Sequence, residues 1–275
     1  MNRQVKCSKD GCIRSRGIEW TDWTWEPVTG CQHDCRWRMP DGTWAICYAC
    51  VIATRLARKA YPEGFEHHYW HPKRLHDPLR LKTPSKIFIS SMGDLFGSWV
   101  PEDQIHAVLE VARQAPQHVF QTLTKNAPRL RKFSPFPQNV WIGASVPPTS
   151  INRRILTLTQ QEKMLRKTID VLKSVDASVR WLSIEPLSWD LAPVLENCGL
   201  QWSVIGAASE GAKTYQPQRS WVQRLLEVLD AEGVPVFFKG NLKWLPWREE
   251  WPRRVGAGGP EQARVAFEND RRGTI

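Results

Sequence analysis

The cysteines carry the clearest chemistry in this sequence, because four of the seven fall within twenty consecutive residues, 31–50. Three residues separate Cys31 from Cys35, eleven separate Cys35 from Cys47, and two separate Cys47 from Cys50. Thiolate sulfur favours iron–sulfur clusters and zinc over hard cations. The spacing therefore predicts one of two sites. All four thiolates could close a structural zinc site. Alternatively, Cys31, Cys35 and Cys47 could hold a 4Fe-4S cluster, leaving Cys50 as a small buried residue. The cysteines alone leave both open.

Composition places limits on the kind of protein that carries this loop. A chain of 275 residues with 41% hydrophobic residues can bury a sizeable core, so global disorder is excluded. There is no run of eighteen apolar residues and no apolar segment at the start, so we expect a soluble, cytoplasmic protein. Cysteines in that reducing setting indicate metal binding or free thiols, not disulfides.

The chain is strongly basic, with a formal net charge of +10. Such a charge attracts polyanions and raises on-rates to nucleic acid. The fifteen tryptophans add surfaces on which bases could stack. Solvated basic faces and a tryptophan-rich core explain the same composition, so nucleic-acid contact is one of two interpretations.

Beyond residue 85 the hydrophobic pattern repeats one unit, in which an apolar strand-like run is followed by a turn and an amphipathic helix. Apolar runs buried on both faces and alternating with helices indicate parallel strands with helical crossovers. Together with a short strand near Trp23, they predict an α/β fold: a partial or complete parallel (β/α) barrel of six to seven strands. The expected strands are 86–91, 118–123, 140–146, 179–184, 202–207 and 234–238, and the expected helices are 102–113, 161–173 and 221–231.

Polar side chains follow most of these strands. In parallel barrels the loops after the strands converge on one mouth, where function gathers. The cysteine loop follows the first strand and belongs at the same mouth. The candidate site residues at the strand ends include Gly93, Asp94, Lys125, Ser145, Glu185 and Lys239.

Three segments are expected along the chain. Residues 1–17 form a basic arm in which Cys7 and Cys12 could bind a second metal, although a mobile tail is the commoner outcome. Residues 18–251 form the barrel domain with the cysteine loop at 31–50. Residues 252–275 are rich in glycine and charge, which predicts a disordered tail.

Several motifs resemble those of a known family. Residues 25–31 (WEPVTGC) and 47–49 (CYA) resemble the two ends of the cluster loop in phage-associated radical SAM-like proteins of unknown function, distant relatives of spore photoproduct lyase. The resemblance continues over roughly residues 18–245, through 88–96 (FISSMGDLF), 120–126 (FQTLTKN), 182–187 (LSIEPL) and 235–239 (PVFFK). One departure is that eleven residues stand between the second and third cysteines where the family has two. Loop-closure cost grows slowly with length, so chelation tolerates the insertion, but it keeps the zinc interpretation open.

The resemblance implies a radical SAM barrel in which Cys31, Cys35 and Cys47 hold a 4Fe-4S cluster. S-adenosyl-L-methionine would chelate the open iron, and its reductive cleavage would give a 5'-deoxyadenosyl radical that abstracts hydrogen from a substrate. Gly93 and Asp94 would bind the methionine part of this cofactor, with Asp94 accepting its ammonium group. Ser145 and Glu185 would bind its ribose or carboxylate.

The substrate side is implied more loosely. Lys125 and Lys239 are the catalytic candidates that would hold an anionic substrate. Kinship and basic charge favour a nucleotide or nucleic acid, whose base would have to be flipped out of a duplex to reach the mouth of a barrel. An electron donor such as flavodoxin or ferredoxin is the implied partner. The rival function is a zinc-stabilised nucleic-acid-binding protein without catalysis.

Overall fold

The computed structural model describes residues 1–4, 17–39, 41–210 and 213–252. Most of the expected N-terminal arm, including Cys7 and Cys12, lies outside the described residues, as does nearly all of the expected C-terminal tail.

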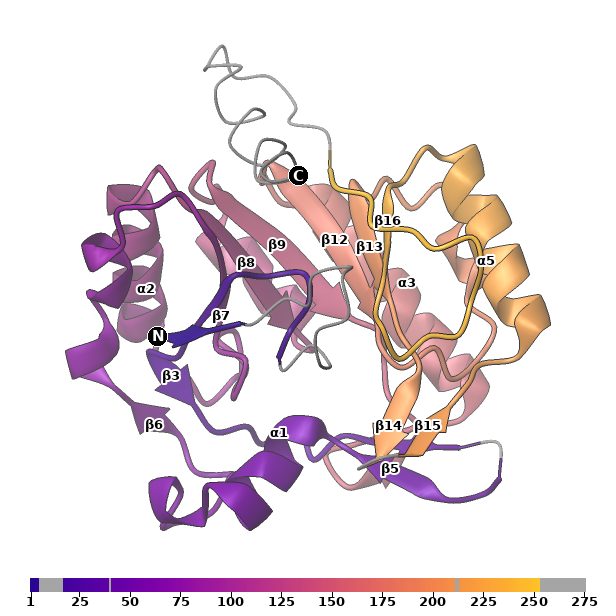
Figure 1. Ribbon diagram of the computed structural model, residues 1–275, viewed down its shortest axis with the longest axis horizontal. Helices are drawn as coiled ribbons and strands as arrows, with labels where there is room; N and C mark the ends of the chain where they lie inside the picture. The colour runs from indigo at the N-terminus through magenta and orange to yellow at the C-terminus, as the bar shows by residue number, and fades with distance from the viewer. Residues whose placement is uncertain (5–16, 40, 211–212, 253–275) are drawn as a thin grey trace, which may run out of the picture.

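A large, mostly parallel sheet forms the centre of the molecule (Figure 1). Its strand order is β1-β2-β7-β8-β9-β12-β13-β16, and only the β1–β2 pair is antiparallel. The strands are β1 (Asn2–Arg3), β2 (Trp23–Trp25), β7 (Lys86–Ile89), β8 (Val119–Thr124), β9 (Val140–Ser145), β12 (Val179–Ile184), β13 (Trp202–Ile205) and β16 (Val236–Phe238). The α/β class and the expected parallel strands are therefore confirmed. Among the described residues no strand pairing joins β16 to β1, so closure of the barrel is not observed.

Helices cover the outer side of this sheet, as their amphipathic sequences require. They are α2 (Glu102–Gln114), α3 (Leu158–Ser174), α4 (Ala192–Leu195) and α5 (Arg219–Ala231), and a 3-10 helix (Ala127–Phe133) follows β8. The first turn of α3 is fixed by a capping box, in which Thr157 and Gln160 exchange side-chain and backbone hydrogen bonds. Within the described ranges, no helix is long and apolar enough to cross a membrane.

The strands bury both faces. Ile87 and Ile89 point into the main core beneath the helices, whereas Phe88 points into a second, aromatic cluster on the inner face. The same alternation places Leu182 in the main core and Trp181 in the inner cluster. A strand buried on both faces reads as a continuous apolar run, and for this reason the sequence pattern located these strands.

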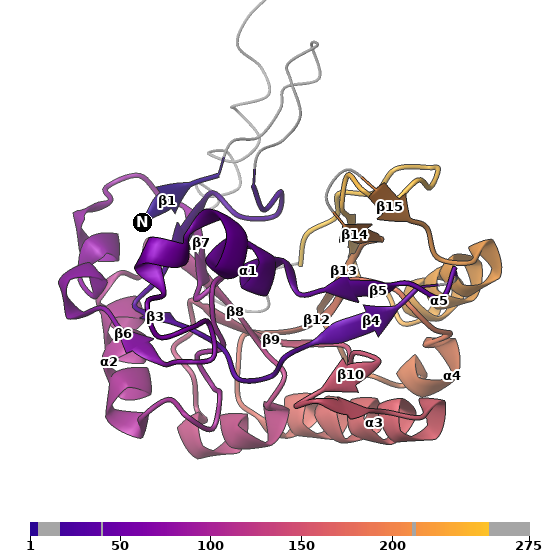
Figure 2. The same ribbon diagram turned by 90° about the horizontal axis from the view of Figure 1, so that it is seen from below.

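Smaller strands and turns lie at the carboxyl ends of the large strands (Figures 1 and 2). The strands β10 (Ser150–Ile151) and β11 (Arg154–Ile155) pair with β4 (Arg36–Arg38) and β5 (Trp44–Ile46) in a four-stranded sheet, order β11-β10-β4-β5. Two further pairs are β3 (Val28–Thr29) with β6 (Tyr69–Trp70), and β14 (Ala208–Glu210) with β15 (Lys213–Tyr215).

The spacing of Ile52, Leu56 and Ala60 predicts one regular helix from Tyr48 onward, but the observed helix is only partly regular. It begins as α1 (Tyr48–Val51), continues as a π-helical turn (Ile52–Leu56) and ends in a 3-10 turn (Arg58–Ala60). That spacing predicts that Leu56 shares a face with Ile52 and Ala60, and the prediction was wrong for Leu56, which is 82% exposed. The π turn, closed by the Ala57 N–H bonding the Ile52 carbonyl at 2.8 Å, shifts the helical period.

Candidate functional site

The carboxyl ends of the parallel strands surround one large cavity of about 1090 Å³. The cysteine loop and the loops after β7, β8, β9, β12, β13 and β16 all contribute to its wall. All nine candidate site residues line it: Cys31, Cys35, Cys47, Gly93, Asp94, Lys125, Ser145, Glu185 and Lys239. Cys50 lines it as well. The structure therefore brings together residues that lie as many as 208 positions apart, from Cys31 to Lys239.

The insertion between the second and third cysteines is a β-hairpin. Strands β4 and β5 pair in antiparallel register, with Arg36 opposite Ile46 and Arg38 opposite Trp44. At the base of the hairpin the Cys47 N–H donates to the Cys35 carbonyl at 3.2 Å. If only two residues separated the two cysteines, the same hydrogen bond would close a β-turn. The hairpin therefore leaves and returns at one place, and the two cysteines stay neighbours despite eleven intervening residues.

The first cysteine is held by backbone on two sides. The Gly30 N–H donates to the Met92 carbonyl at 2.9 Å, and the Cys31 N–H donates to the Phe65 carbonyl at 2.7 Å. Gly30 has φ of +91°, and a Cβ at this position would lie 1.8 Å from the His67 carbonyl oxygen. Only glycine satisfies both the backbone angle and this close approach.

Asp94 connects the cysteine loop to the strand ends. Its carboxylate is 4% exposed and accepts hydrogen bonds from His33 Nε2 at 2.9 Å and from the backbone N–H of Lys125 at 2.9 Å. It also accepts from the Thr124 hydroxyl at 3.1 Å and the Phe96 N–H at 3.0 Å. Burial alone would raise the pKa of Asp94, but the hydrogen bonds and charge of His33, with those of Lys125 and Thr124, outweigh it and lower the pKa. Its role as acceptor of a methionine ammonium stays a prediction.

Sequence reasoning missed three residues that position this loop. His33 lies between Cys31 and Cys35, and a histidine at that place in the sequence was the signal that could have identified it. Glu26 is 6% exposed, accepts the Ser91 and Met92 N–H groups at 3.1 Å each, and also accepts the Ser91 hydroxyl. Tyr48 then donates to the Ser91 carbonyl at 2.6 Å. Burial raises the pKa of Glu26 despite these hydrogen bonds. This network fixes the loop after β7 against the residues that flank the cysteines.

The opposite wall carries an ion pair and an amide. Lys239 pairs with Glu185, and both are part-buried. Asn241 accepts from the Ala207 N–H at 3.1 Å and donates to the Ser209 hydroxyl at 3.1 Å. The two lysines predicted to hold an anionic substrate therefore differ, because Lys239 is neutralised by a carboxylate and Lys125 is not ion-paired within the described part of the chain.

The thiols lie in a poorly solvated setting. Burial raises the pKa of Cys35 to about 12 and raises that of Cys31 as well. Burial also acts to lower the pKa of Lys125, but the thiolates of Cys35, Cys47 and Cys31 outweigh it and raise the pKa. A soft metal ion is the charge that would keep such buried thiols deprotonated.

The residues present fit a cluster with a polar ligand beside it. Three thiols from one loop line a cavity whose wall also carries three buried polar atoms, Trp20 Nε1, His33 Nδ1 and Ser90 Oγ, that have no hydrogen-bond partner among the described residues. Buried polar atoms of this kind call for a polar ligand or water. As they stand, no three cysteine, histidine or carboxylate side chains of the described residues are arranged to share a metal ion, so metal binding would require these groups to rearrange.

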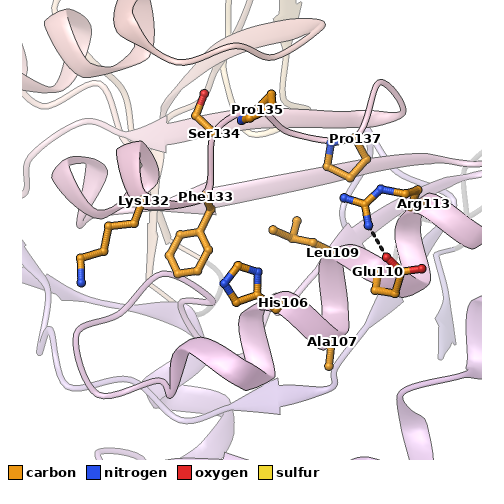
Figure 3. Close-up of a pocket in the computed structure, with 10 residues that line it drawn as sticks. All are labelled: His106, Ala107, Leu109, Glu110, Arg113, Lys132, Phe133, Ser134, Pro135 and Pro137. Atoms are coloured by element: carbon orange, nitrogen blue, oxygen red, sulfur yellow. Dashed lines mark hydrogen bonds and ion pairs between the residues drawn. The ribbon is translucent and has the colours of Figure 1, made fainter.

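A second, smaller cavity of about 490 Å³ lies on the outer helical layer between α2 and the 3-10 helix after β8 (Figure 3). It is lined by the edge-on pair His106 and Phe133 and by the ion pair of Glu110 with Arg113. It contains none of the candidate site residues. All of the candidate site residues therefore line the larger cavity at the strand ends.

Known proteins resemble this chain mainly in fold. No curated protein matches it. A cysteine-to-serine mutant of spore photoproduct lyase superposes with a TM-score of 0.53 and 10% identity, over 84% of this chain and 81% of that one. A spore photoproduct lyase structure with bound AdoMet and dinucleoside spore photoproduct gives a TM-score of 0.42 and 10% identity, over 75% and 60%. The first similarity shows a shared fold, and the second is too low to add to it. A family model described as a protein of unknown function (DUF5131) matches residues 15–266, and the chain therefore belongs to that family.

Proposed function

We propose that this chain is a radical SAM-type iron–sulfur enzyme that abstracts hydrogen from a nucleotide or nucleic acid. One observation carries the proposal: the three thiols of Cys31, Cys35 and Cys47 line the same large cavity as the polar groups at the ends of the parallel strands. The fold shared with spore photoproduct lyase, itself a radical SAM enzyme, supports the same conclusion.

Cys31, Cys35 and Cys47 would hold a 4Fe-4S cluster at the edge of the cavity. When bound and reduced, the cluster would supply the one electron that divides S-adenosyl-L-methionine into methionine and a 5'-deoxyadenosyl radical. The protein supplies position, dryness and charge. The His33–Asp94 hydrogen bond and the bond from the Gly30 N–H to the Met92 carbonyl hold the cysteine loop in place, and Lys125 places a positive charge beside the thiols.

The remaining wall would orient the cofactor and the substrate. Ser145, on β9, and Glu185, after β12, line the cavity and would bind the ribose or carboxylate of the cofactor. Phe88, Leu123 and Trp20 contribute apolar wall that excludes water from reactive species. Lys125 and Lys239 would bind an anionic substrate. Lys239 would have to leave its ion pair with Glu185 to do so.

A nucleic-acid substrate is supported by charge. The chain carries a formal net charge of +10, and several of its cations line the cavity or its rim. A cavity at a barrel mouth reaches a base only when that base is unpaired or flipped out, so a single-stranded or damaged site is the expected target.

The test is made on protein purified without oxygen. We expect about four irons and matching sulfide per chain, a brown absorption that bleaches on reduction, and 5'-deoxyadenosine when S-adenosyl-L-methionine and dithionite are added. Iron should be lost in Cys35→Ala. Colourless protein with one zinc per chain and no 5'-deoxyadenosine would contradict the proposal.

The zinc-stabilised, non-catalytic alternative is kept open by one observation, which is that Cys50 lines the same cavity as the other three cysteines. Zinc would need Cys50 as its fourth thiolate. Cys50→Ala therefore separates the two functions: the iron–sulfur enzyme keeps its metal in this variant, and the zinc protein loses it.

A further inference from the structure

The hairpin formed by residues 36–46 has an outer face that the proposed chemistry does not use. Its register places Arg36, Arg38 and Trp44 on one side. The two arginines are exposed and the tryptophan is half-buried, whereas Trp37 between them packs on the opposite side with Ala208 of β14. The hairpin therefore has an apolar side toward the body of the molecule and a basic, aromatic side toward solvent.

A further arginine lies in the neighbouring β10–β11 hairpin. Arg153 is exposed, lies in the two-residue turn between β10 and β11, and lines the large cavity together with Arg36. The Ser150–Arg36 bridge joins its hairpin to β4. We call Arg36, Arg38, Arg153 and Trp44 the arginine rim. Figure 2 shows β4 and β10 side by side next to the segment that carries the cysteines.

Hydrogen bonds connect the two hairpins of the arginine rim to each other and to the cysteine loop. The Asn152 N–H donates to the His33 carbonyl at 2.6 Å, and the Arg38 N–H donates to the Thr149 hydroxyl at 3.1 Å. A ligand bound to the rim would therefore lie beside the cavity, whose wall includes Arg36 and Arg153.

The charge of the rim is largely uncompensated. Arg36 forms an ion pair with Asp34 at 3.2 Å, but Arg38 and Arg153 have no carboxylate partner in the part of the chain that the structure describes. Planar guanidinium groups bind phosphate through two parallel hydrogen bonds. Across the hairpin from Arg38, the Trp44 indole offers a face on which a base can stack. Cations interleaved with an aromatic platform are the arrangement by which proteins bind single strands.

We propose that the arginine rim binds the phosphodiester backbone of a single-stranded or locally unpaired nucleic acid, with Trp44 stacking on a base. This inference rests on the proposed function, in which one base of that strand reaches the cavity. It assigns the insertion a purpose, since the residues that lengthen the cysteine loop are the ones that supply Arg36, Arg38 and Trp44.

The experiment measures binding of a fluorescein-labelled single-stranded oligodeoxynucleotide by anisotropy over a range of salt concentrations. The test variant is Arg38→Glu/Arg153→Glu. Its matched control is Lys163→Glu/Lys167→Glu, which makes the same charge change at exposed positions of α3. Losing two phosphate contacts should weaken binding roughly 20-fold at 0.1 M salt and reduce the log–log salt slope by about 1.4, while the control changes little.

Two further variants separate the contributions. Trp44→Ala should weaken binding about fivefold or more without changing the salt slope, because stacking releases no counterions. Arg38→Lys/Arg153→Lys should leave the salt slope unchanged, because both charges remain, but should weaken binding by less than the Glu variant, because an ammonium group cannot form the two parallel hydrogen bonds. Circular dichroism melts confirm that each variant is folded.

Several results would overturn the inference. The first is that the protein binds no oligonucleotide at low salt, and the second is that the α3 control loses as much binding as the Arg38→Glu/Arg153→Glu variant. The third is that this variant also loses binding to poly-L-glutamate while Trp44→Ala binds the oligonucleotide as well as the wild type does. The last would indicate a surface for an acidic protein. Oligonucleotide binding requires no cluster, so the two proposals can fail separately. Binding that depends on the rim, without formation of 5'-deoxyadenosine, would contradict the proposed reaction but not the rim. Formation of 5'-deoxyadenosine, without binding that depends on the rim, would contradict the rim but not the reaction.

Discussion

At the scale of single residues, Asp94 is the acceptor on which the cysteine loop depends. It is buried and accepts four hydrogen bonds from the protein, one of them from His33 between the first two cysteines. Asp94→Asn keeps the shape but points an amide N–H₂ at backbone donors. We expect a loss of about 2–4 kcal/mol in the free energy of unfolding, measured in urea.

The same variant has a pH signature. The folded-state pKa of Asp94 is lowered below its ordinary value of 3.8, so its stabilisation is fully present above that value and is lost as the pH falls through the folded-state pKa. The difference between wild type and Asp94→Asn should be constant at neutral pH and shrink below about pH 4. Asp170→Asn, at an exposed position of α3, is the control. A difference that stays constant down to pH 2 would show that Asp94 has the same pKa in the folded and the unfolded chain.

Gly30 tests how tightly the first cysteine is clamped. Gly30 and Gly42 both have positive φ, +91° and +83°, but a Cβ meets the His67 carbonyl at the first and nothing within 4 Å at the second. Gly42→Ala should therefore cost only about 1 kcal/mol, from the backbone angle alone. Gly30→Ala should cost at least about 3 kcal/mol or prevent folding. Equal costs in urea unfolding would mean that the backbone at His67 moves aside.

At the scale of elements, the β4–β5 hairpin should be separable from the metal site. Replacing residues 36–46 by Asp-Gly restores a two-residue turn closed by the existing Cys35–Cys47 hydrogen bond. We expect iron content to be retained, because all three thiols remain. Stability should fall by about 3 kcal/mol, because Trp37 and Met39 no longer cover Ile151 and Ala208. Loss of iron in this variant, measured with sulfide after anaerobic purification, would show that the hairpin itself shapes the cluster site.

Elements differed in how far the sequence could predict them. The strands after residue 85 were located correctly because both faces are apolar, and α2, α3 and α5 because their apolar faces keep one helical period. The helix after Tyr48 was predicted less well, because a π turn changes its helical period and no residue type in the sequence signals that turn. The hairpin has an ordinary turn signal at Gly42, but its pairing with β10 depends on residues more than a hundred positions away.

The candidate site was predictable to a similar extent. Residues that follow parallel strands must gather at one edge, so the composition of the cavity wall followed from the strand assignment. The partners of each residue did not follow. Asp94 with His33, and Lys239 with Glu185, are pairings set by loop geometry that no periodicity encodes.

At the scale of the whole molecule, residues just before β2 and just after β16 pack against the inner side of the open sheet. Trp20, before β2, packs on Phe88 and Trp181, with ring centroids 4.7 and 5.1 Å apart. Trp251, after β16, stacks on Trp202 at 5.2 Å. The Gly240 N–H donates to Glu19 at 2.7 Å and so joins the two ends directly. An open sheet would otherwise expose its inner aromatic face, so these residues take the place that further strands hold in a closed barrel.

This arrangement predicts that the inner cluster sets the stability of the whole fold. Trp20 is 3% exposed, and Trp20→Ala removes a large side chain from between three aromatic rings. The cost should be about 3–5 kcal/mol in the free energy of unfolding, because the rigid strands around it cannot collapse into the cavity. Trp247, which is 41% exposed and lies on the outer side of β16 against Phe238, is the matched control, and Trp247→Ala should cost less than about 1 kcal/mol. Urea unfolding followed by far-ultraviolet circular dichroism measures both without relying on tryptophan emission. Equal and small losses would show that the segment before β2 is an appendage, and that the seven parallel strands hold their curvature without it.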